Sequence, residues 1–270
     1  MRFRTTRLAL VVHGGAGNSK ENEDGCVAAA RKGFERLRGG GDALSAAVDA
    51  VVHLEDDERF NAGTGSILRD DGKTIETDAS VMDSQGRLGA VSCLQRVKNP
   101  VLVAQKVVDT AHWMLAGAGA QEFARAKGFP DYDLSPKHKS QMKAPACDTV
   151  GAVALDAHGN FAVASSTGGS APAMRGRVGD TPIPGCGFWA GPQGAVAATG
   201  VGEEIVPRML ARVVYEWIER GIPLEQALAR AVALLPESSD VGLIAVTRSE
   251  SAVASNRSMP THIVEHELQD

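Results

Sequence analysis

The amino-acid composition of the chain changes most sharply at Thr149. The residues before it, Asp133 to Cys147, read DLSPKHKSQMKAPAC, a polar stretch with Lys and Pro and no apolar period. This composition is typical of a linker, which we place over about residues 131–148. The residues from Thr149 to Leu155 read TVGAVAL, which predicts a β-strand buried on both faces. The linker therefore delivers Thr149 to the edge of a core.

Helices and strands are mixed along the rest of the chain. Leu8 to Val12 predicts a buried strand, and apolar residues at helical spacing between Cys26 and Leu37 predict a helix that ends at three glycines. Asp42 is placed to cap a second helix that reaches about Leu54. Further strands are expected over 75–82, 89–94, 161–166 and 241–247, and further helices over 100–110, 203–220 and 223–234.

The composition indicates a globular chain that binds neither nucleic acid nor membranes. With 270 residues, 43% hydrophobic and 23% charged, the chain is long enough for a full core in a single domain. The net charge of -5 leaves no positive field for nucleic acid or anionic lipid. No uncharged stretch approaches the roughly 18 apolar residues of a membrane helix.

The four cysteines form no pair at the spacing of a redox or zinc site. Reduced thiols and a cytoplasmic location are therefore expected. Nothing in the residue pattern indicates a metal-catalysed enzyme.

Thr149 would need a base to act as a nucleophile, because a threonine hydroxyl is weakly nucleophilic at neutral pH. No histidine is obviously placed for this task. A free α-amine has a pKa of about 7.7–8.0 and could serve if the chain were cut between Asp148 and Thr149. On position alone, however, Thr149 is more simply a β-branched residue at the start of a strand.

Seven ordered motifs between about residues 8 and 247 favour a catalytic role for Thr149. They are LVVHGGAG (10–17), FNAGTGS (60–66), DASVMD (78–83), DTVGAVALD (148–156), STGG (166–169), GRVGDTPIPGCG (176–187) and ATGVGE (198–203). Together they resemble the plant-type L-asparaginase and isoaspartyl peptidase family of N-terminal-nucleophile hydrolases. The resemblance implies an α+β fold, a four-layer αββα sandwich, cut by the chain itself into residues 1–148 and 149–270.

The resemblance also implies catalytic roles. Thr149 would be the nucleophile, with the Thr167 hydroxyl beside it, and the Thr199 hydroxyl and Gly200 N–H would form the oxyanion hole. Asn61 would lie near the nucleophile. Without the resemblance, Thr167 would be read as a turn hydroxyl and Gly200 as a turn glycine.

Arg177 and Asp180 resemble the family's clamp for the α-carboxylate and α-ammonium of the substrate, with Gly200 and Gly202 at the same binding site. A guanidinium offers a bidentate fork to a carboxylate, and an aspartate suits an ammonium group. The alternative is a surface ion pair between Arg177 and Asp180 without a role in binding.

The segment from Leu54 to Thr64, which includes Asn61, resembles the family's sodium-binding loop. Mapped onto this chain, a structural sodium would be held by the main-chain carbonyls of Leu54, Glu55, Asp57, Phe60, Ala62 and Thr64. No cofactor is expected for catalysis itself. His13 and Gly14 begin a loop that, by the same resemblance, lies close to the cleavage point, although a purely structural histidine is an equal reading.

Departures from the family's pattern leave the substrate open. The stretch SAPAMR (170–175), the short linker and the tail SNRSMP (255–260) differ from the usual forms. Asp148 before the threonine also occurs in the related glycosylasparaginases, so asparagine, isoaspartyl dipeptides and glycosylated asparagine all remain candidates.

Two other protein classes share parts of this pattern. HGGAG resembles the oxyanion loop of α/β-hydrolases, but the G-x-S-x-G elbow of that class does not occur. A non-catalytic module that binds a small molecule remains an alternative. The expected assembly is a homodimer of processed heterodimers.

Overall fold

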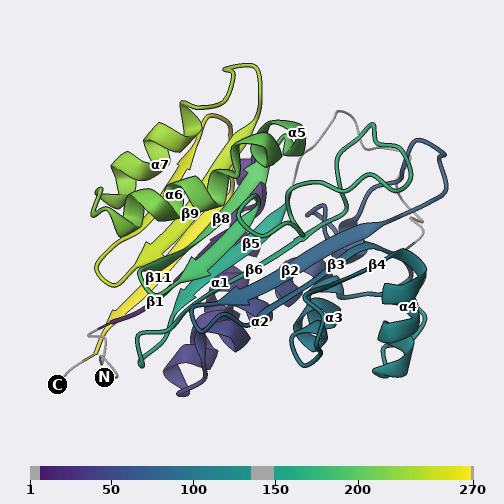
Figure 1. Cartoon of the computed structure of the whole chain (residues 1–270), viewed down its shortest axis with the longest axis horizontal. Coiled ribbons are helices and arrows are strands. Elements are labelled where there is room, and N and C mark those ends of the chain that lie inside the picture. Colours follow the sequence, from purple (N-terminus) through teal and green to yellow (C-terminus); the bar gives the residue numbers. More distant parts are fainter. Residues whose placement is uncertain (1–6, 135–148, 269–270) are drawn as a thin grey trace.

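The computed structural model describes residues 7–134 and 149–268 and combines strands with helices (Figure 1). The strands are β1 (Arg7–His13), β2 (Thr77–Asp83), β3 (Leu88–Leu94), β4 (Met114–Ala116), β5 (Val150–Leu155), β6 (Phe161–Thr167), β7 (Phe188–Gly191), β8 (Gly194–Gly200), β9 (Val241–Thr247), β10 (Ser251–Ser255) and β11 (Thr261–Glu267). The helices are α1 (Glu23–Arg38), α2 (Ala43–Asp56), α3 (Pro100–Val107), α4 (Gly117–Ala126), α5 (Gly202–Ile205), α6 (Leu210–Glu219) and α7 (Leu224–Val232). The mixed α+β class is confirmed.

The strands form two sheets. The larger has the order β11-β1-β5-β6-β2-β3-β4, and the smaller has the order β10-β9-β8-β7. All neighbours pair antiparallel except β3 and β4, which are parallel. The predicted strand at Thr149 lies within the larger sheet, between β1 and β6. Helices cover one face of this sheet and the smaller sheet lies against the other, so the strand is buried on both faces.

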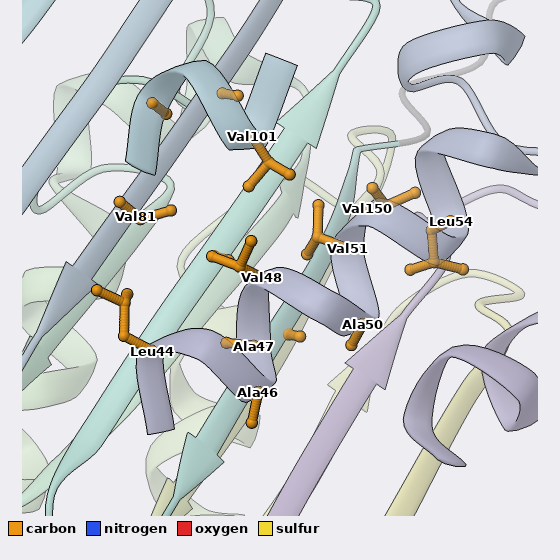
Figure 2. Close-up of a cluster of buried hydrophobic side chains, with 14 of the residues drawn as sticks. Leu44, Ala46, Ala47, Val48, Ala50, Val51, Leu54, Val81, Val101 and Val150 are labelled. Carbon is orange, nitrogen blue, oxygen red and sulfur yellow. The ribbon is translucent and has the colours of Figure 1, made fainter. Parts of the chain in front are cut away.

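One face of the larger sheet is covered by α1 to α4. Figure 2 shows the side chains of α2, among them Val48 and Val51, between the helix and the strands, near Val81 and Val150. Helix α2 begins where the Asp42 side chain accepts the N–H of Ser45 at 2.7 Å, as the sequence predicts for an N-cap. On the smaller sheet, α6 and α7 pack over residues of β8 and β9 in a second cluster (Figure 1).

A third apolar cluster joins the two sheets. It contains Val11 and Val153 from the larger sheet and Ala197 and Ile244 from the smaller one. Because side chains alternate along a strand, every second residue of β1, β5, β6 and β8 faces this inter-sheet layer.

One expected helix is interrupted. The prediction of a single helix over 203–220 is wrong, because α5 gives way to a 3-10 turn at Val206–Arg208 before α6 begins. Pro207 in that turn lacks the N–H that would continue the helix, and Met209 has a left-handed φ of 45°.

None of the helices within residues 7–134 and 149–268 is long and apolar enough to cross a membrane. The predicted linker from residue 135 onward lies outside the described residues, as do Cys147 and the predicted cleavage residue Asp148.

Candidate active site

Hydroxyl and carboxylate side chains replace apolar ones at one end of the inter-sheet layer. Thr149 and Val153 share a face of the strand that β5 forms, so Thr149 points toward the smaller sheet. Val150 pairs with Ser166, which brings Thr149 next to Thr167 across the strands. Thr167 in turn pairs with Asp78 of β2. Strand register alone therefore aligns Thr149, Thr167 and Asp78 in one row.

A narrow pocket opens above this row. Its volume is about 10 Å³, about the space that one water molecule requires. The residues that line it are Thr149, Thr167, Gly169, Ser170, Arg177, Gly179, Asp180, Thr181 and Gly200. Five of the predicted site residues thus meet in one place although they span more than 50 positions of sequence. The other predicted catalytic and substrate-binding residues of the described chain, Asn61, Thr199 and Gly202, are neighbours of the lining.

Thr149 is buried, with 5% of its surface exposed, directly before β5. Its Oγ1 lies 3.4 Å from Oγ1 of Thr181. The predicted nucleophile therefore lies among other hydroxyls in the lining of the pocket.

Thr199 and Gly200 form the end of β8. The Thr199 oxygen accepts a hydrogen bond from the N–H of Ala16 at 3.3 Å, so the proton of its hydroxyl can be donated to another group. Ala16 belongs to the HGGAG loop, which this contact ties to the predicted oxyanion hole. Gly200 has φ of 144°, which an L side chain rarely adopts, and a Cβ there would lie 2.2 Å from the carbonyl oxygen of Asp240.

Asn61 supports the chain that follows Thr167. Its side-chain amide donates to the carbonyl of Gly169 at 2.6 Å, and its own carbonyl accepts the N–H of Gly168 at 2.7 Å. Its Oδ1 accepts the N–H of Ile67 at 3.2 Å. Asn61 therefore holds a lining loop in place from outside the pocket.

Arg177 and Asp180 both line the pocket, but the ion pair of Arg177 is made with Glu203. The guanidinium contacts both carboxylate oxygens of Glu203, at 3.0 and 2.8 Å. Asp180 is 3% exposed, and its Oδ2 has no hydrogen-bond partner among the described residues. The two residues are thus not arranged as the surface ion pair that the sequence left open.

Gly202 allows these two charged groups to approach closely. A Cβ at this position would lie 2.7 Å from Nη2 of Arg177 and 3.1 Å from Oδ1 of Asp180. A larger residue would therefore displace the clamp predicted at the binding site.

Burial shifts the acid–base behaviour of the site. Desolvation raises the pKa of Asp180 to about 7, against the opposing charge of Arg177. Desolvation also raises the pKa of Asp78 to about 6, while the Cys93 N–H and Arg69 oppose the shift. Burial lowers the pKa of His13 to about 3, so this histidine is neutral at physiological pH. His13 pairs with Gly151, two residues from Thr149, which places it near the predicted cut.

The segment resembling a sodium loop turns back on itself. Thr64 Oγ1 donates to the carbonyl of Glu55 at 2.7 Å, so the two ends of the segment lie side by side. Main-chain N–H groups donate at 2.8–3.3 Å to four of the other predicted carbonyls, those of Leu54, Asp57, Phe60 and Ala62. Each carbonyl retains a second lone pair, and oxygen ligands suit a hard cation. A structural sodium ion at this segment stays a prediction.

Four lining residues received no role from the sequence: Gly169, Ser170, Gly179 and Thr181. Thr181 directly follows Asp180 in the motif GRVGDT, so its position in a motif was the available signal. Glu203, the last residue of ATGVGE, was also missed, because its pairing with Arg177 depends on how two distant loops meet.

Comparisons with known proteins identify the family of this chain. A family model described as asparaginase matches residues 6–143 and 135–267. The isoaspartyl peptidase/L-asparaginase of Danio rerio is 42% identical over 258 residues, covering 86% of this chain and 82% of the relative. The human protein of that name is 40% identical over 281 residues, covering 93% and 91%. The plant-type L-asparaginase of Pyrococcus abyssi is 36% identical over 261 residues, covering 84% and 85%. With matches of this extent, the chain belongs to the asparaginase family.

Proposed function

We propose that this chain is a self-processing threonine hydrolase that releases aspartate from L-asparagine and from isoaspartyl dipeptides. The observation that carries the proposal is the convergence of Thr149, Thr167, Arg177, Asp180 and Gly200 on one pocket. The relatives named isoaspartyl peptidase/L-asparaginase support the same reaction.

Thr149 acts as nucleophile once the bond to Asp148 is broken. In the precursor its hydroxyl attacks the Asp148 carbonyl, and water hydrolyses the resulting ester. In the mature protein the new α-amine accepts the hydroxyl proton, since its pKa of about 7.7–8.0 suits a base at neutral pH. Thr149 then attacks the side-chain amide of the substrate, ammonia or an amino acid leaves, and water releases aspartate.

The charged groups of the pocket match the remaining parts of the substrate. The unpartnered carboxylate oxygen of Asp180 suits the α-ammonium, and the guanidinium of Arg177 suits the α-carboxylate. Thr199 and the N–H of Gly200 would stabilise the oxyanion, a contribution of about 3–4 kcal/mol per donor in other enzymes.

The layered arrangement supports assignment to the αββα sandwich of N-terminal-nucleophile hydrolases. Separate apolar clusters lie between the first helices and the larger sheet, between the two sheets, and between the smaller sheet and α6–α7. A structural sodium within residues 54–64, a dimer of processed heterodimers and a cytoplasmic location stay predictions.

A glycosylasparaginase activity is the second candidate. It rests on Asp148 before the threonine, whereas the names of the relatives favour the first candidate. A non-catalytic binding module is the third, and it predicts that Thr149→Ala leaves ligand binding intact.

The test combines intact mass spectrometry with aspartate release from asparagine, an isoaspartyl dipeptide and glycosylated asparagine. Wild-type protein should yield fragments 1–148 and 149–270 and hydrolyse the first two substrates, whereas Thr149→Ala should stay whole and inert. Thr110→Ala, a matched change in the turn that follows α3, should behave as wild type. Wild-type protein that stays uncut and inert would refute the proposal, and preference for the glycosylated substrate would select the second candidate.

A further inference from the structure

Thr181, to which no role was assigned from the sequence, lies directly beside the predicted nucleophile Thr149. Its Oγ1 is 3.4 Å from Thr149 Oγ1, and the residue is 1% exposed. It reaches the pocket from the loop of Arg177 and Asp180, whereas Thr167 reaches it from the neighbouring strand. Two hydroxyls therefore approach Thr149 from different elements.

We propose that Thr181 is a further catalytic residue whose hydroxyl donates a hydrogen bond to Oγ1 of Thr149. This inference rests on the proposed role of Thr149 as nucleophile. The separation of 3.4 Å is longer than the roughly 2.7–2.8 Å of a typical O–H···O bond. Catalytic hydrogen bonds are often long before substrate binds and shorten in the complex.

The chain around Thr181 is held on both sides. Ser80 of β2, itself fully buried, donates to the carbonyl of Thr181 at 2.6 Å. The carbonyl of the preceding Asp180 accepts the N–H groups of Ile183 and Gly187, at 3.0 and 3.1 Å. A β-branched side chain on such a backbone has few χ1 rotamers, so the hydroxyl is aimed before substrate arrives.

The direction of the hydrogen bond follows from the proton transfer. Thr149 Oγ1 has one proton, which passes to the α-amine as the oxygen attacks, and two lone pairs that can accept. Thr181 donates to one lone pair, keeps its own proton, and stabilises the negative charge that develops on Oγ1. When the acyl-enzyme is hydrolysed, the same contact stabilises the departing oxygen, and the proton returns from the ammonium group.

Two substitutions of Thr181 distinguish a hydrogen-bonding role from a packing role. Thr181→Val keeps the shape and removes the hydroxyl, whereas Thr181→Ser keeps the hydroxyl and removes the methyl group. We expect Thr181→Val to lower kcat by about 10- to 100-fold, with KM for asparagine and Kd for aspartate almost unchanged. Thr181→Ser should stay within about threefold of wild type. A packing role predicts the reverse order.

Thr77→Val is the matched control. Thr77 is a buried threonine of β2 whose hydroxyl donates to Leu94 at 3.0 Å and which alternates with Asp78 and Ser80, on the opposite face. This variant should retain the wild-type kcat. Self-cleavage of each variant is followed by intact mass, and slower cleavage of Thr181→Val than of Thr181→Ser also supports the proposal.

The outcomes that overturn the proposal are distinct from failure of the proposed function. If wild-type protein is active and Thr181→Val matches it, or if Thr181→Ser is impaired as much as Thr181→Val, the hydroxyl has no catalytic role. A change confined to KM or to aspartate binding would show that Thr181 only shapes the pocket. Wild-type protein that is neither cut nor active would refute the role of Thr149, and that of Thr181 with it.

Discussion

The ion pair between Arg177 and Glu203 occupies the guanidinium that is proposed to bind the substrate carboxylate. Arg177 is mostly buried, whereas the side chain of Glu203 is 65% exposed. An incoming carboxylate must therefore replace Glu203 as the partner of Arg177. Because Glu203 lies largely in solvent, its pairing with Arg177 is weak, about 1 kcal/mol, and a substrate carboxylate can replace it at little cost.

Removal of the Glu203 charge should improve substrate binding. We predict that Glu203→Gln lowers KM for asparagine by about two- to fivefold with little change in kcat, since an exposed pair contributes at most about 1 kcal/mol. Steady-state kinetics at constant ionic strength measure this effect. Glu204→Gln, which affects a neighbouring pair with Arg208, is the control. A higher KM in Glu203→Gln would mean that Glu203 orients Arg177 and does not compete with substrate.

Asp180 should make ligand binding depend on pH near neutrality. Its pKa is about 7 in the free protein, and only the ionised form attracts an ammonium group. Below pH 7 the carboxyl is protonated, so the Kd for aspartate should rise, approaching tenfold per pH unit. Because bound ammonium lowers the pKa of Asp180, binding at pH 6 should release a proton.

Calorimetric titration of aspartate between pH 5.5 and 8, in buffers of different ionisation enthalpy, tests both statements. The titration of Asp78, with a pKa of about 6, adds to the lower part of the profile, whereas His13 stays neutral throughout. Asp180→Asn should bind aspartate weakly and without this pH dependence. A constant Kd in wild-type protein over the whole range would contradict the assignment of Asp180 to the ammonium group.

At the scale of elements, β2 and the residue before it support the binding loop. Glu76 and then Asp78 and Ser80 lie on one face of the strand, because side chains alternate. Glu76 accepts the N–H of Gly176 at 2.7 Å, and Ser80 donates to the carbonyl of Thr181 at 2.6 Å. One strand thus anchors the loop at both ends.

Glu76 also neutralises the buried Arg69. Nε of Arg69 lies 3.3 Å from Oε2 of Glu76, and the two side chains are 0% and 4% exposed. Arg69 in turn donates to the carbonyl of Arg177 at 3.3 Å. Glu76→Gln should lower the free energy of unfolding by about 3 kcal/mol, since it leaves a buried charge without its partner. It should also raise KM for asparagine, because the loop is less firmly held.

Urea unfolding and steady-state kinetics measure these two effects, with the exposed Glu122→Gln of α4 as control. Unchanged stability of Glu76→Gln would show that Asp78 alone neutralises Arg69.

At the scale of the molecule, the predicted cut divides a sheet whose strands interleave. Strand β1 of the first fragment lies between β11 and β5 of the second, and β6 of the second pairs with β2 of the first. The two fragments therefore share ladders of hydrogen bonds and one inter-sheet core.

We predict that the cut protein elutes as one species in size-exclusion chromatography and separates only in denaturant. Its refolding should depend on protein concentration, because two chains must meet, whereas refolding of the uncut Thr149→Ala should be less dependent. Fragments that elute apart under native conditions would contradict the interleaved sheet.

Local patterns predicted several elements well. The apolar run of β1, the Asp42 cap of α2 and the strand Val241–Thr247 follow from apolar content and capping chemistry. The strand β8 was not predicted, because Gly and Ala dominate its sequence, and β7 was not predicted, because its four residues are too few to show a period. The edge strand β11 was missed for a different reason, since most of its side chains contact solvent and leave no apolar run.

The sequence by itself determined the likeness to a family and, through seven ordered motifs, the identity of most lining residues. Only the tertiary structure decided which of them meet: Thr181 beside Thr149, Glu203 on Arg177, and Glu76 beneath Gly176. Motifs are local in the chain, whereas these contacts join residues 26 to 100 positions apart. Such contacts depend on strand register and on the packing of two sheets, which no local pattern specifies.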